Sequence, residues 1–541
     1  MRILLAYVTD CPDPSLTNSE TNFTSLLPIG LCSLHALLRS RGFEVTLANL
    51  TGTSERDYAA TLQQTQPDLL GFSHWTHNRH STYHYARFAK QVLPACRIIL
   101  GGGHATHQAE LILQRHPEID LIVAGESEQT LPELLQALQT KSALQSIPGL
   151  VLRNSGEPLR TLARLPLQFL DTLPFPAAHL RAALNVDLSL QPEFISTSRG
   201  CPAACNFCAS PAFWGQRVRY RSAASVAAEM RFVRDEYGLI YLSLRDDTFT
   251  ADRRRTVELC REMIESRLNV FWNCQSRVEA IDRPTLEWMR RAGCECIQLG
   301  VESGSERMLH LLGKRIKPSQ VVKAAELIHQ AGIQLSVYLI SGIPGETDTD
   351  RRQTINLINA IMPDDVQAAP LAYYPGTTLF EQAVKDGTVS DDLFETSHHD
   401  AVLAQRDGQH QVDRLLSRTA GFRYLQSVRQ LQGIQREQGF SAVTAMHQGD
   451  LQQSLGNRAA AETQYRQLTT HEPDHPWGWY LLAELLEQQG RTRNAAGCYE
   501  RVLQLVPRHL PSQQGLQRTN AKKATDFFQP PSGLLHQTRT T

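Results

Sequence analysis

The sequence lacks a long apolar run, because none of its segments approaches the roughly 20 consecutive apolar residues that a membrane-spanning helix needs. It also lacks an excess of charge of either sign: 54 lysines and arginines stand against 55 aspartates and glutamates in 541 residues. A chain with this balance has no overall field for nucleic acid or for an anionic membrane surface, although a local basic patch would escape the count. We therefore expect no membrane span and no nucleic-acid partner.

A secretory signal is also missing. The opening MRILLAYVTDCPD reaches a polar turn by Asp10 without a charged start, a long apolar centre or a small-residue cleavage site. This start predicts a strand and a cytoplasmic location. Cysteines are sparse and odd in number, 11 in all, yet three of them fall within eight residues. In a reducing cytosol such a cluster favours metal ligation over disulfides.

Residues 1–145 alternate short apolar runs with amphipathic helical patterns. The runs cover 3–8, 43–50, 68–75, 97–102 and 120–125, and the helical patterns include 29–42 and 127–139. Short apolar runs are typical of strands buried on both faces, so the alternation predicts a Rossmann-like doubly wound parallel sheet. Such sheets bind ligands at the carboxyl ends of their strands. The segments expected there are SHWT (73–76), GGGHAT (101–106) and GESE (125–128).

A second alternating block follows a segment, 146–190, whose many turn formers predict a linker. Between 191 and 385 six apolar runs alternate with helical patterns. These runs cover 193–200, 240–247, 270–277, 296–303, 334–342 and 366–374. Six consecutive βα steps predict a partial (β/α)6 barrel, with its active site at the carboxyl ends of the strands.

The strand pattern stops after about residue 385, and the rest is predicted to be all-α. Residues 386–439 form a helical extension, and 440–515 contain pairs of residues offset by 34: Gly456 and Gly490, Ala461 and Ala495, Tyr465 and Tyr499, Pro473 and Pro507. This offset is typical of tetratricopeptide repeats, which usually need at least three units for stability. Only two are visible, so the preceding helical segment (417–452) would supply the missing layer. The region reads equally as a binding module for a protein partner or as a helical cap, and 516–541 as a disordered tail.

The strongest chemical signal is the segment RGCPAACNFCAS (199–210), in which Cys201, Cys205 and Cys208 are spaced CxxxCxxC. Three thiolates on one tight loop can hold three corners of a cubane iron–sulfur cluster and leave the fourth iron open. Zinc is the alternative ligand. Structural zinc takes four ligands, however, and no fourth Cys or His follows within 20 residues.

This motif resembles that of the radical S-adenosylmethionine (SAM) superfamily, in which CxxxCxxC holds a 4Fe–4S cluster and SAM chelates the open iron. Three later segments also resemble strand ends of that family: LRDDTF (244–249), GVESGS (300–305) and SGIPGET (341–347). The resemblance covers about 190–385. It implies reductive cleavage of SAM to a deoxyadenosyl radical that abstracts hydrogen from a substrate, with an electron donor such as flavodoxin or ferredoxin.

The resemblance also implies SAM-binding roles for acidic side chains at the second and fourth strand ends. Asp246 and Asp247 would accept hydrogen bonds from the SAM ammonium group, although one of them could instead cap the next helix. Glu302, followed by Ser303, would accept from the ribose hydroxyls. The alternative for Glu302 is a core ion pair.

Three further positions are read in the same way. Gly342 and Gly345 would let the backbone approach the adenine, while Thr347 is an equally good helix N-cap. Arg277 would reach the SAM carboxylate or form a salt bridge with Glu279. A second metal site at Cys294 and Cys296 is disfavoured, since buried free cysteines are common.

The N-terminal block resembles the cobalamin-binding domain that often precedes a radical SAM barrel, over residues 1–140. The DxHxxG motif of its best-known form is absent, which implies cobalamin bound without a histidine below the cobalt. A domain that binds nothing is the alternative. The side chains expected to contact cobalamin lie at strand ends: Ser73, Thr76, Gly101, Gly102, Gly103 and His104. The neighbouring His74, His77, His80 and His84 are expected on the surface or on a helix.

Together these resemblances predict a cobalamin-dependent radical SAM enzyme that methylates an unactivated carbon of an unknown substrate. One alternative is a radical cyclisation, rearrangement or oxidation without methyl transfer. A methylthiotransferase fits less well, because Cys11, Cys32 and Cys96 are irregularly placed and the C-terminus is helical. A different class is a non-catalytic cobalamin-binding or partner-binding scaffold, which the intact cysteine motif argues against.

Overall fold

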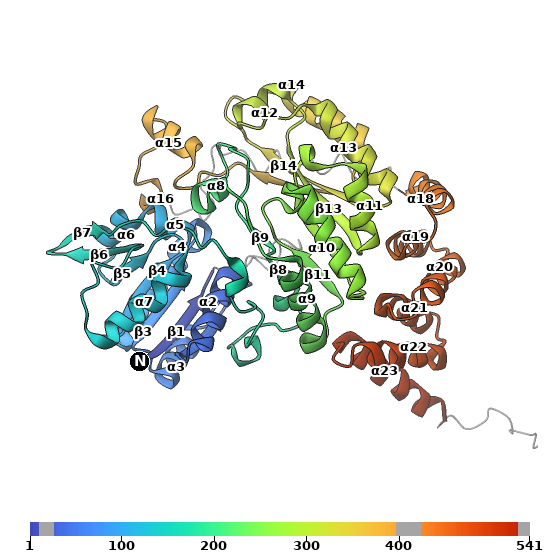
Figure 1. Cartoon of the computed structure of the whole chain (residues 1–541), viewed down its shortest axis with the longest axis horizontal. Helices are drawn as coiled ribbons and strands as arrows, with labels where there is room; N and C mark the ends of the chain where they lie inside the picture. Colours follow the sequence, from blue (N-terminus) through green and yellow to red (C-terminus); the bar gives the residue numbers. More distant parts are fainter. Residues whose placement is uncertain (10–25, 397–423, 528–541) are drawn as a thin grey trace, which may run out of the picture.

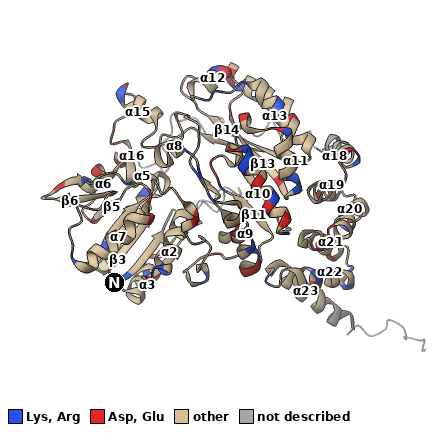
Figure 2. Cartoon of the chain, in the orientation of Figure 1, with Lys and Arg blue, Asp and Glu red and all other residues tan. Residues whose placement is uncertain are grey.

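The computed structural model describes residues 1–9, 26–396 and 424–527 and folds them into three parts (Figure 1). A seven-stranded sheet with its helices forms the N-terminal domain. A six-stranded sheet forms the partial barrel, and helices α18–α23 form a helical module on the far side of that barrel. In the view of Figure 2, basic and acidic residues are interspersed over the barrel helices. No helix among the described residues is long and apolar enough to cross a membrane.

The N-terminal sheet has the order β2-β1-β3-β4-β5-β6-β7, and its first five strands are parallel. The strands are β1 (Arg2–Tyr7), β2 (Glu44–Asn49), β3 (Leu69–Ser73), β4 (Arg97–Gly101) and β5 (Leu121–Val123). The helices are α2 (Ile29–Ser40), α3 (Glu55–Thr65), α4 (Arg79–Val92), α5 (Gly103–His107), α6 (Ala109–Arg115) and α7 (Ser127–Thr140). The doubly wound sheet is therefore confirmed, with the expected strands in place.

The sheet continues into the segment expected to be a linker. Strands β6 (Leu150–Asn154) and β7 (Glu157–Arg160) form an antiparallel hairpin that pairs with β5. Ser155 and Gly156 both have positive φ, 50° and 93°, which suits the two-residue turn of a hairpin. A turn signal was thus correct here, but the turn joins two strands. Only the 3₁₀ turns η2 (Leu170–Thr172), η3 (Leu180–Ala182) and η4 (Gln191–Glu193) fill the remaining connection.

The partial barrel has six parallel strands in the order β8-β11-β12-β13-β14-β15. They are β8 (Phe194–Ile195), β11 (Tyr241–Leu244), β12 (Phe271–Ser276), β13 (Cys294–Glu302), β14 (Gln334–Ser341) and β15 (Asp365–Pro370). The helices between them are α8 (Ala209–Trp214), α9 (Ala223–Tyr237), α10 (Arg253–Glu265), α11 (Arg283–Arg291), α12 (Glu306–Leu311), α13 (Pro318–Ala331) and α14 (Asp348–Ile361), with the 3₁₀ turns η5 (Phe249–Ala251) and η6 (Val278–Ala280).

The strand expected at 193–200 is divided in two. After β8 the chain bends, and β9 (Ser198–Arg199) pairs with β10 (Arg219–Tyr220) in a separate antiparallel ribbon. The cause is Asp246, whose carboxylate accepts the backbone N–H groups of Thr197 (2.6 Å) and Ser198 (3.0 Å). Because these two N–H groups are bound to Asp246, they cannot pair with a neighbouring barrel strand. The chain therefore leaves the sheet before β9, which leads into the cysteine segment.

The N-terminal domain and the barrel share one apolar core. A single cluster of buried side chains runs from Leu31 on α2 through Leu170 and Leu180 to Ile195 and Val226 of the barrel. A second cluster lies under α3 and α4, on the other face of the N-terminal sheet. Shared burial of this kind holds the two domains together.

A segment after the barrel returns to the N-terminal domain and contains α15 (Thr378–Lys385) and α16 (Leu393–Thr396). The fully buried Arg79 donates from Nε to the Phe394 carbonyl at 2.8 Å. His116 Nε2 lies 2.8 Å from a carboxylate oxygen of Glu395. These contacts connect the two domains a second time, at the edge away from the shared core.

The helical module consists of α18 (Tyr424–Gln438), α19 (Ala442–Ser454), α20 (Arg458–His471), α21 (Pro476–Gln488), α22 (Thr492–Leu505) and α23 (Leu510–Phe527). The all-helical region is confirmed, and Tyr465 and Tyr499, which are 34 residues apart, are both fully buried. The predicted disordered tail is wrong for residues 516–527, because α23 continues to Phe527. Residues 528–541 of the predicted tail lie outside the described residues. So do residues 397–423, which belong to the predicted helical extension and include the start of the helical segment expected at 417–452.

The module packs against the edge of the barrel at which the strands begin. Trp477 Nε1 donates to the Ile240 carbonyl at 2.7 Å, and His447 Nε2 lies 3.0 Å from the Glu295 carbonyl. Phe271, the first residue of β12, is buried against Val443 and Met446. The helices α19 and α21 make these contacts, while α20 and α22 lie on the outer side (Figure 1). Of the two interpretations left open by the sequence, these contacts favour the cap.

Candidate functional site

The three motif cysteines lie on a loop between β9 and α8. Gly200 opens this loop with φ +99°, and a Cβ there would lie 2.8 Å from the Arg217 carbonyl oxygen, so the position requires glycine. Cys201 and Cys205 are buried, and Cys208 is the N-cap residue of α8. Asn206 fixes the far side of the loop, because its side-chain amide donates to the Leu311 carbonyl at 2.6 Å.

Polar groups from the barrel strands surround the cysteine sulfurs. Thr248 Oγ1 lies 3.4 Å from Cys201 Sγ, and Arg277 Nη1 lies 3.5 Å from Cys205 Sγ. Arg277 also pairs with Glu279 at 2.7 Å through Nε, so the salt bridge expected as its alternative is present. Burial, together with the negative charges of Asp247, Cys205 and Cys201, raises the pKa of the Cys208 thiol to about 11. The three cysteine side chains are therefore close enough to interact electrostatically.

The loop fits an iron–sulfur cluster better than a single ion. Among the described residues, no three His, Cys, Asp or Glu side chains form a ready-made group for one metal ion. A cubane cluster separates its ligand sulfurs by the width of the cube, so its thiolates need not converge on one point. Three cysteines on one loop, with a cation beside one sulfur, match the thiolate donor set that such clusters take.

The two aspartates after β11 have different places. Asp246 is buried and its carboxylate is occupied by Thr197 and Ser198, so it holds the start of β9 in place. Asp247 lines a cavity between the two domains. Neither residue caps α10, whose N-cap is Asp252, accepting from the backbone N–H of Arg255 at 3.0 Å.

Glu302 ends β13 with φ +67°, beside a register shift in the ladder to β14. This left-handed residue turns the chain, and its carboxylate lies 2.6 Å from Lys314 Nζ. The core ion pair expected as the alternative is thus present. Ser303 Oγ lies 3.2 Å from Thr354 Oγ1 and accepts from the Ser305 backbone N–H at 3.1 Å.

The glycine segment after β14 forms a tight turn. Gly342 and Gly345 have φ of 69° and 75°, in the left-handed region that favours glycine. The Gly342 N–H donates to Glu346 at 3.2 Å, and the Gly345 carbonyl accepts from Arg307 at 2.8 Å. Thr347 is the N-cap of α14, as its alternative interpretation predicted.

A cavity of about 300 Å³ lies between the strand ends of the N-terminal domain and the barrel. Of the six residues expected to contact cobalamin, Ser73, Gly101 and Gly102 line it. Gly102 has φ +110°, and a Cβ there would lie 2.7 Å from the His74 carbonyl oxygen. Ser198, Arg199 and Asp247 line the barrel side of the same cavity, so one space joins both halves of the predicted site.

The other three residues lie next to this wall. Gly103 begins α5, and a Cβ there would be 3.1 Å from the Trp75 ring. Thr76 and His104 are buried and bonded to each other, with Oγ1 and Nδ1 3.0 Å apart. No histidine is among the described residues that line the cavity.

The expected surface position of His74 is wrong. It follows β3 and is fully buried, with its ring 5.1 Å from that of His104 and 5.0 Å from that of Tyr83. Burial lowers its pKa well below the usual range, so the imidazole is neutral. His74 directly follows β3, in a buried connection and not in a helix, and this position explains why its side chain does not reach the surface. His80 and His84 do lie on α4, and His77 in the 3₁₀ turn η1 (Thr76–Asn78).

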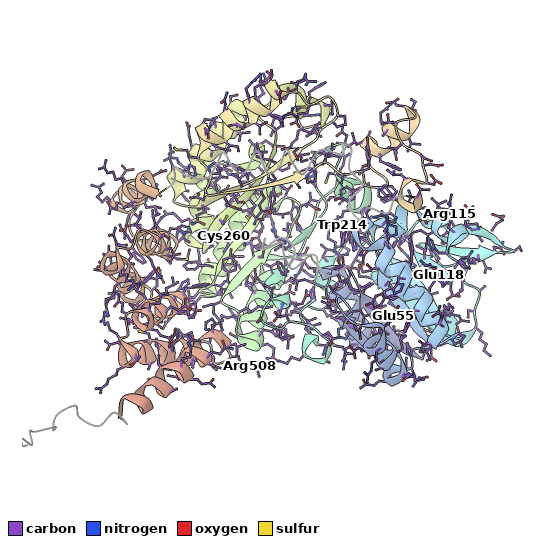
Figure 3. The ribbon with its side chains drawn as sticks, turned by 180° about the vertical axis from the view of Figure 1, so that it is seen from behind. Glu55, Arg115, Glu118, Trp214, Cys260 and Arg508 are labelled. Carbon is purple, nitrogen blue, oxygen red and sulfur yellow. The ribbon has the colours of Figure 1, made fainter. Side chains whose placement is uncertain are left out.

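Several cavity residues were not among those that the sequence predicted to contact a cofactor. Trp75, Phe213 and Trp214 form an aromatic wall, with ring centroids of Trp75 and Phe213 6.2 Å apart. Figure 3 labels Trp214 at the junction of the two domains. Glu126 and Glu128 were part of the GESE segment, but nothing in the sequence paired them with Arg199, which they contact.

Comparison with known proteins identifies both domains. Residues 195–358 match the radical SAM superfamily, and residues 23–135 match the B12 binding domain. An uncharacterized methyltransferase of Pyrococcus horikoshii is 30% identical over 362 residues, which cover 66% of this chain and 78% of that protein. The anaerobic magnesium-protoporphyrin IX monomethyl ester cyclase of Cereibacter sphaeroides is 27% identical over 338 residues, covering 61% of this chain and 55% of that protein.

A solved structure extends the likeness to nearly the whole chain. The cobalamin-dependent SAM radical enzyme OxsB, with aqua-cobalamin bound, matches with a TM-score of 0.60 at 15% identity and covers 97% of this chain and 84% of that one. At this identity the match concerns the fold. With the cysteine loop, the strand-end cavity and the two matched domains, the chain belongs to the radical SAM superfamily, in its branch with a B12 binding domain. Its cofactors are a 4Fe–4S cluster, SAM and cobalamin.

Proposed function

We propose that this enzyme transfers a methyl group to an unactivated carbon of a small molecule. The observation that carries the proposal is the single cavity whose wall contains both the strand-end glycines of the B12 binding domain and Asp247 of the barrel. Methyl transfer between a cobalamin carrier and a carbon activated at the barrel needs such a shared space. The name of the Pyrococcus relative supports the same reaction class.

The residues of this chain would divide the work as follows. Cys201, Cys205 and Cys208 hold the cluster, and Arg277 places a positive charge beside one sulfur. Asp247 and the backbone of the Gly342–Gly345 turn bind SAM, with Glu302 and Ser303 shaping the β13 end. Ser73, Gly101 and Gly102 form the cobalamin wall, and Thr76, Gly103 and His104 support it from behind. When bound, the cluster supplies the electron that opens SAM, and cobalamin carries the methyl group.

The lining of the cavity also bears on the substrate. Apolar side chains from three segments form much of the wall: Ile29, Leu34, Leu170, Leu173, Phe213 and Trp214. Four of its charged groups are held in ion pairs: Arg199 with Glu126 and Glu128, and Arg221 with Glu229. We infer a substrate with a substantial apolar surface, since a polar one would lose its hydration without gaining partners.

Methyl-labelled SAM tests the proposal. The chain is reconstituted anaerobically with iron, sulfide and cobalamin, reduced, and given labelled SAM with a metabolite extract. Mass spectrometry should find a product that carries the label. The Cys208→Ala variant should give none and lose its iron, whereas Cys260→Ala, in the fully buried middle of α10, should keep both.

The cyclase relative supports a second candidate, a radical cyclisation or oxidation without methyl transfer. The same experiment separates the two, because a cyclised or oxidised product would carry no label. An unlabelled product with full SAM cleavage would therefore replace the methyltransferase proposal. Stoichiometric zinc without iron in anaerobically purified protein would reject both.

Three narrower proposals complete this function. A flavodoxin or ferredoxin supplies the electron, since the part of the chain that the structure describes holds no ready-made group of metal ligands for a second electron carrier. The cytoplasm is the expected compartment, because every cysteine that the structure describes is a free thiol. The helical module belongs to the tetratricopeptide type, with its outer helices α20 and α22 left for a protein partner.

A further inference from the structure

Four charged side chains meet where the N-terminal domain contacts the cysteine segment. Glu126 and Glu128 come from the start of α7, and Arg199 and Arg219 from the β9–β10 ribbon. Arg199 lies 3.3 Å from Glu126 and 2.6 Å from Glu128, and Arg219 pairs with Glu126. We call these four residues the interdomain clamp.

The clamp is buried and balanced in charge. Its side chains are 4–12% exposed, and two carboxylates face two guanidinium groups. Burial alone would lower the pKa of Arg199, but the charges of Glu128 and Glu126 raise it. Removing one member would leave an unpaired buried charge, which is far more costly than removing a complete pair.

The clamp acts on the segment that carries the cysteines. Arg199 and Arg219 are opposite each other in the β9–β10 pairing, and Arg199 is two residues before Cys201. The Arg199 guanidinium also stacks on Trp214, 5.0 Å from the ring, at the end of α8 beyond Cys208. Arg199 therefore contacts both ends of the cysteine loop, and its carboxylate partners belong to the other domain.

The clamp is also part of the cavity wall. Glu126, Glu128 and Arg199 line the cavity beside Gly125, at the strand ends where the B12 binding domain faces the barrel. A rigid ion-pair network at this place fixes the relative position, or offset, of the two walls of the cavity, one from the B12 binding domain and one from the barrel. Apolar packing, which is not directional, would leave that offset less defined.

We propose that the interdomain clamp positions the cysteine loop against the B12 binding domain and so sets the distance between cluster and cobalamin. These are positioning residues, not catalytic ones. The inference rests on the cofactors of the family and deepens the proposed function, but it does not require methyl transfer itself.

The first test is a double-mutant cycle on the protein without cofactors. Glu128→Gln and Arg199→Gln should each lower the midpoint of thermal unfolding by roughly 5–10 °C, because each leaves one buried charge unpaired. The double variant should recover most of this loss, since Glu126 and Arg219 remain as a neutral pair. Glu110→Gln is the matched control: its pair with Arg160 lies within the N-terminal domain and is 41–45% exposed, so little change is expected.

The second test measures position. With cob(II)alamin and the chemically reduced cluster bound, the magnetic interaction between the two is read from the relaxation of the cobalt EPR signal, which depends steeply on distance. The double variant, although stable, should change this interaction at least twofold, while Glu110→Gln should match the wild type. A double variant with wild-type relaxation would overturn the proposal and leave the clamp a stabilising pair only. If the EPR change is found but no labelled product ever forms, the methyltransferase proposal falls and the clamp stands.

Discussion

The guanidinium of Arg277 lies 3.5 Å from the sulfur of Cys205, although 72 residues separate them in the chain. Arg277 directly follows the third barrel strand, β12, and its side chain is only 12% exposed, so its charge is weakly screened by water. A fixed cation at this distance stabilises the thiolate and, with it, the more negative state of any cluster that the thiolate holds.

We expect Arg277→Gln to lower the reduction potential of the cluster. Loss of the cation disfavours the added electron, by on the order of 50 mV because Glu279 already offsets part of the charge. An EPR-monitored redox titration measures the shift. Arg277→Lys keeps the charge and should stay near the wild-type potential; equal potentials in all three proteins would contradict the role assigned to this charge.

Gly102→Ala should impair the cobalamin wall. The backbone here has φ +110° and ψ 178°, a region essentially restricted to glycine, so alanine costs about 1–3 kcal/mol. Thermal unfolding should show this loss, and equilibrium dialysis should show weaker cobalamin binding. Gly497→Ala, on the exposed side of α22 and outside the cavity lining, serves as the control, because a Cβ there meets nothing within 4 Å.

The absence of histidine from the described cavity lining predicts the spectrum of bound cobalamin. Without an imidazole below the cobalt, the ultraviolet–visible spectrum should be of the base-off type. An EPR signal of cob(II)alamin with nitrogen coupling from a protein ligand would contradict this expectation.

His116 makes the contact of α16 with the N-terminal domain pH-dependent. Burial alone would lower its pKa, but hydrogen bonds to Glu118 and Glu395 raise it above the ordinary value of 6.5. A raised pKa in the folded state means that this stabilisation is complete below about pH 6.5 and is lost as the pH rises through the folded-state pKa. Limited proteolysis after α16 should therefore become faster on going from acid to alkaline pH.

The control for this prediction is His116→Gln, which cannot become charged. It should lose roughly 1–3 kcal/mol at low pH and show a flat proteolysis profile. A wild-type profile that is equally flat would show that the histidine does not titrate in this range.

Trp477→Ala should destabilise the barrel and not only the helical module. Trp477 donates to Ile240 and packs against Phe271, with ring centroids 5.8 Å apart. We expect a loss of roughly 2–4 kcal/mol in the free energy of unfolding. Trp479→Ala, whose indole bonds Pro473 within the module, is the matched control.

Removal of residues 440–541 extends this test. Phe271, buried by Val443 and Met446, would face water, so the truncated chain should lose its cluster and precipitate. The interpretation of this region as a binding module predicts the opposite result, cluster binding without the module. A soluble truncated protein that binds iron and cleaves SAM would restore the view that the module serves recognition alone.

Local patterns in the sequence predicted much of the fold. Each parallel strand is a short apolar run, and the cysteines are adjacent in the chain, so both could be recognised without knowledge of distant contacts. The β6–β7 hairpin was missed because its strands, LVLRN and EPLR, are short and carry charges on the edge of the sheet.

Contacts between distant segments could not be predicted. Asp246 and Asp247 are neighbours, yet only the bend of the chain at Thr197 decides which carboxylate is occupied and which faces the cavity. Likewise, the partner of Glu128 is 71 residues away, and no local spacing relates them. The residues that a site needs for its chemistry were visible, whereas those that fix its dimensions were not.

The placement of the helical module has a practical consequence. It lies at the edge where the barrel strands begin, and the cavity lies where they end. Figure 3 labels Arg508, which lies between α22 and α23 and pairs with Glu236 of the barrel, far from Trp214 at the cavity wall. An anchor attached through the outer helix α22 would therefore hold the enzyme on a solid support by the side of the barrel away from the cavity.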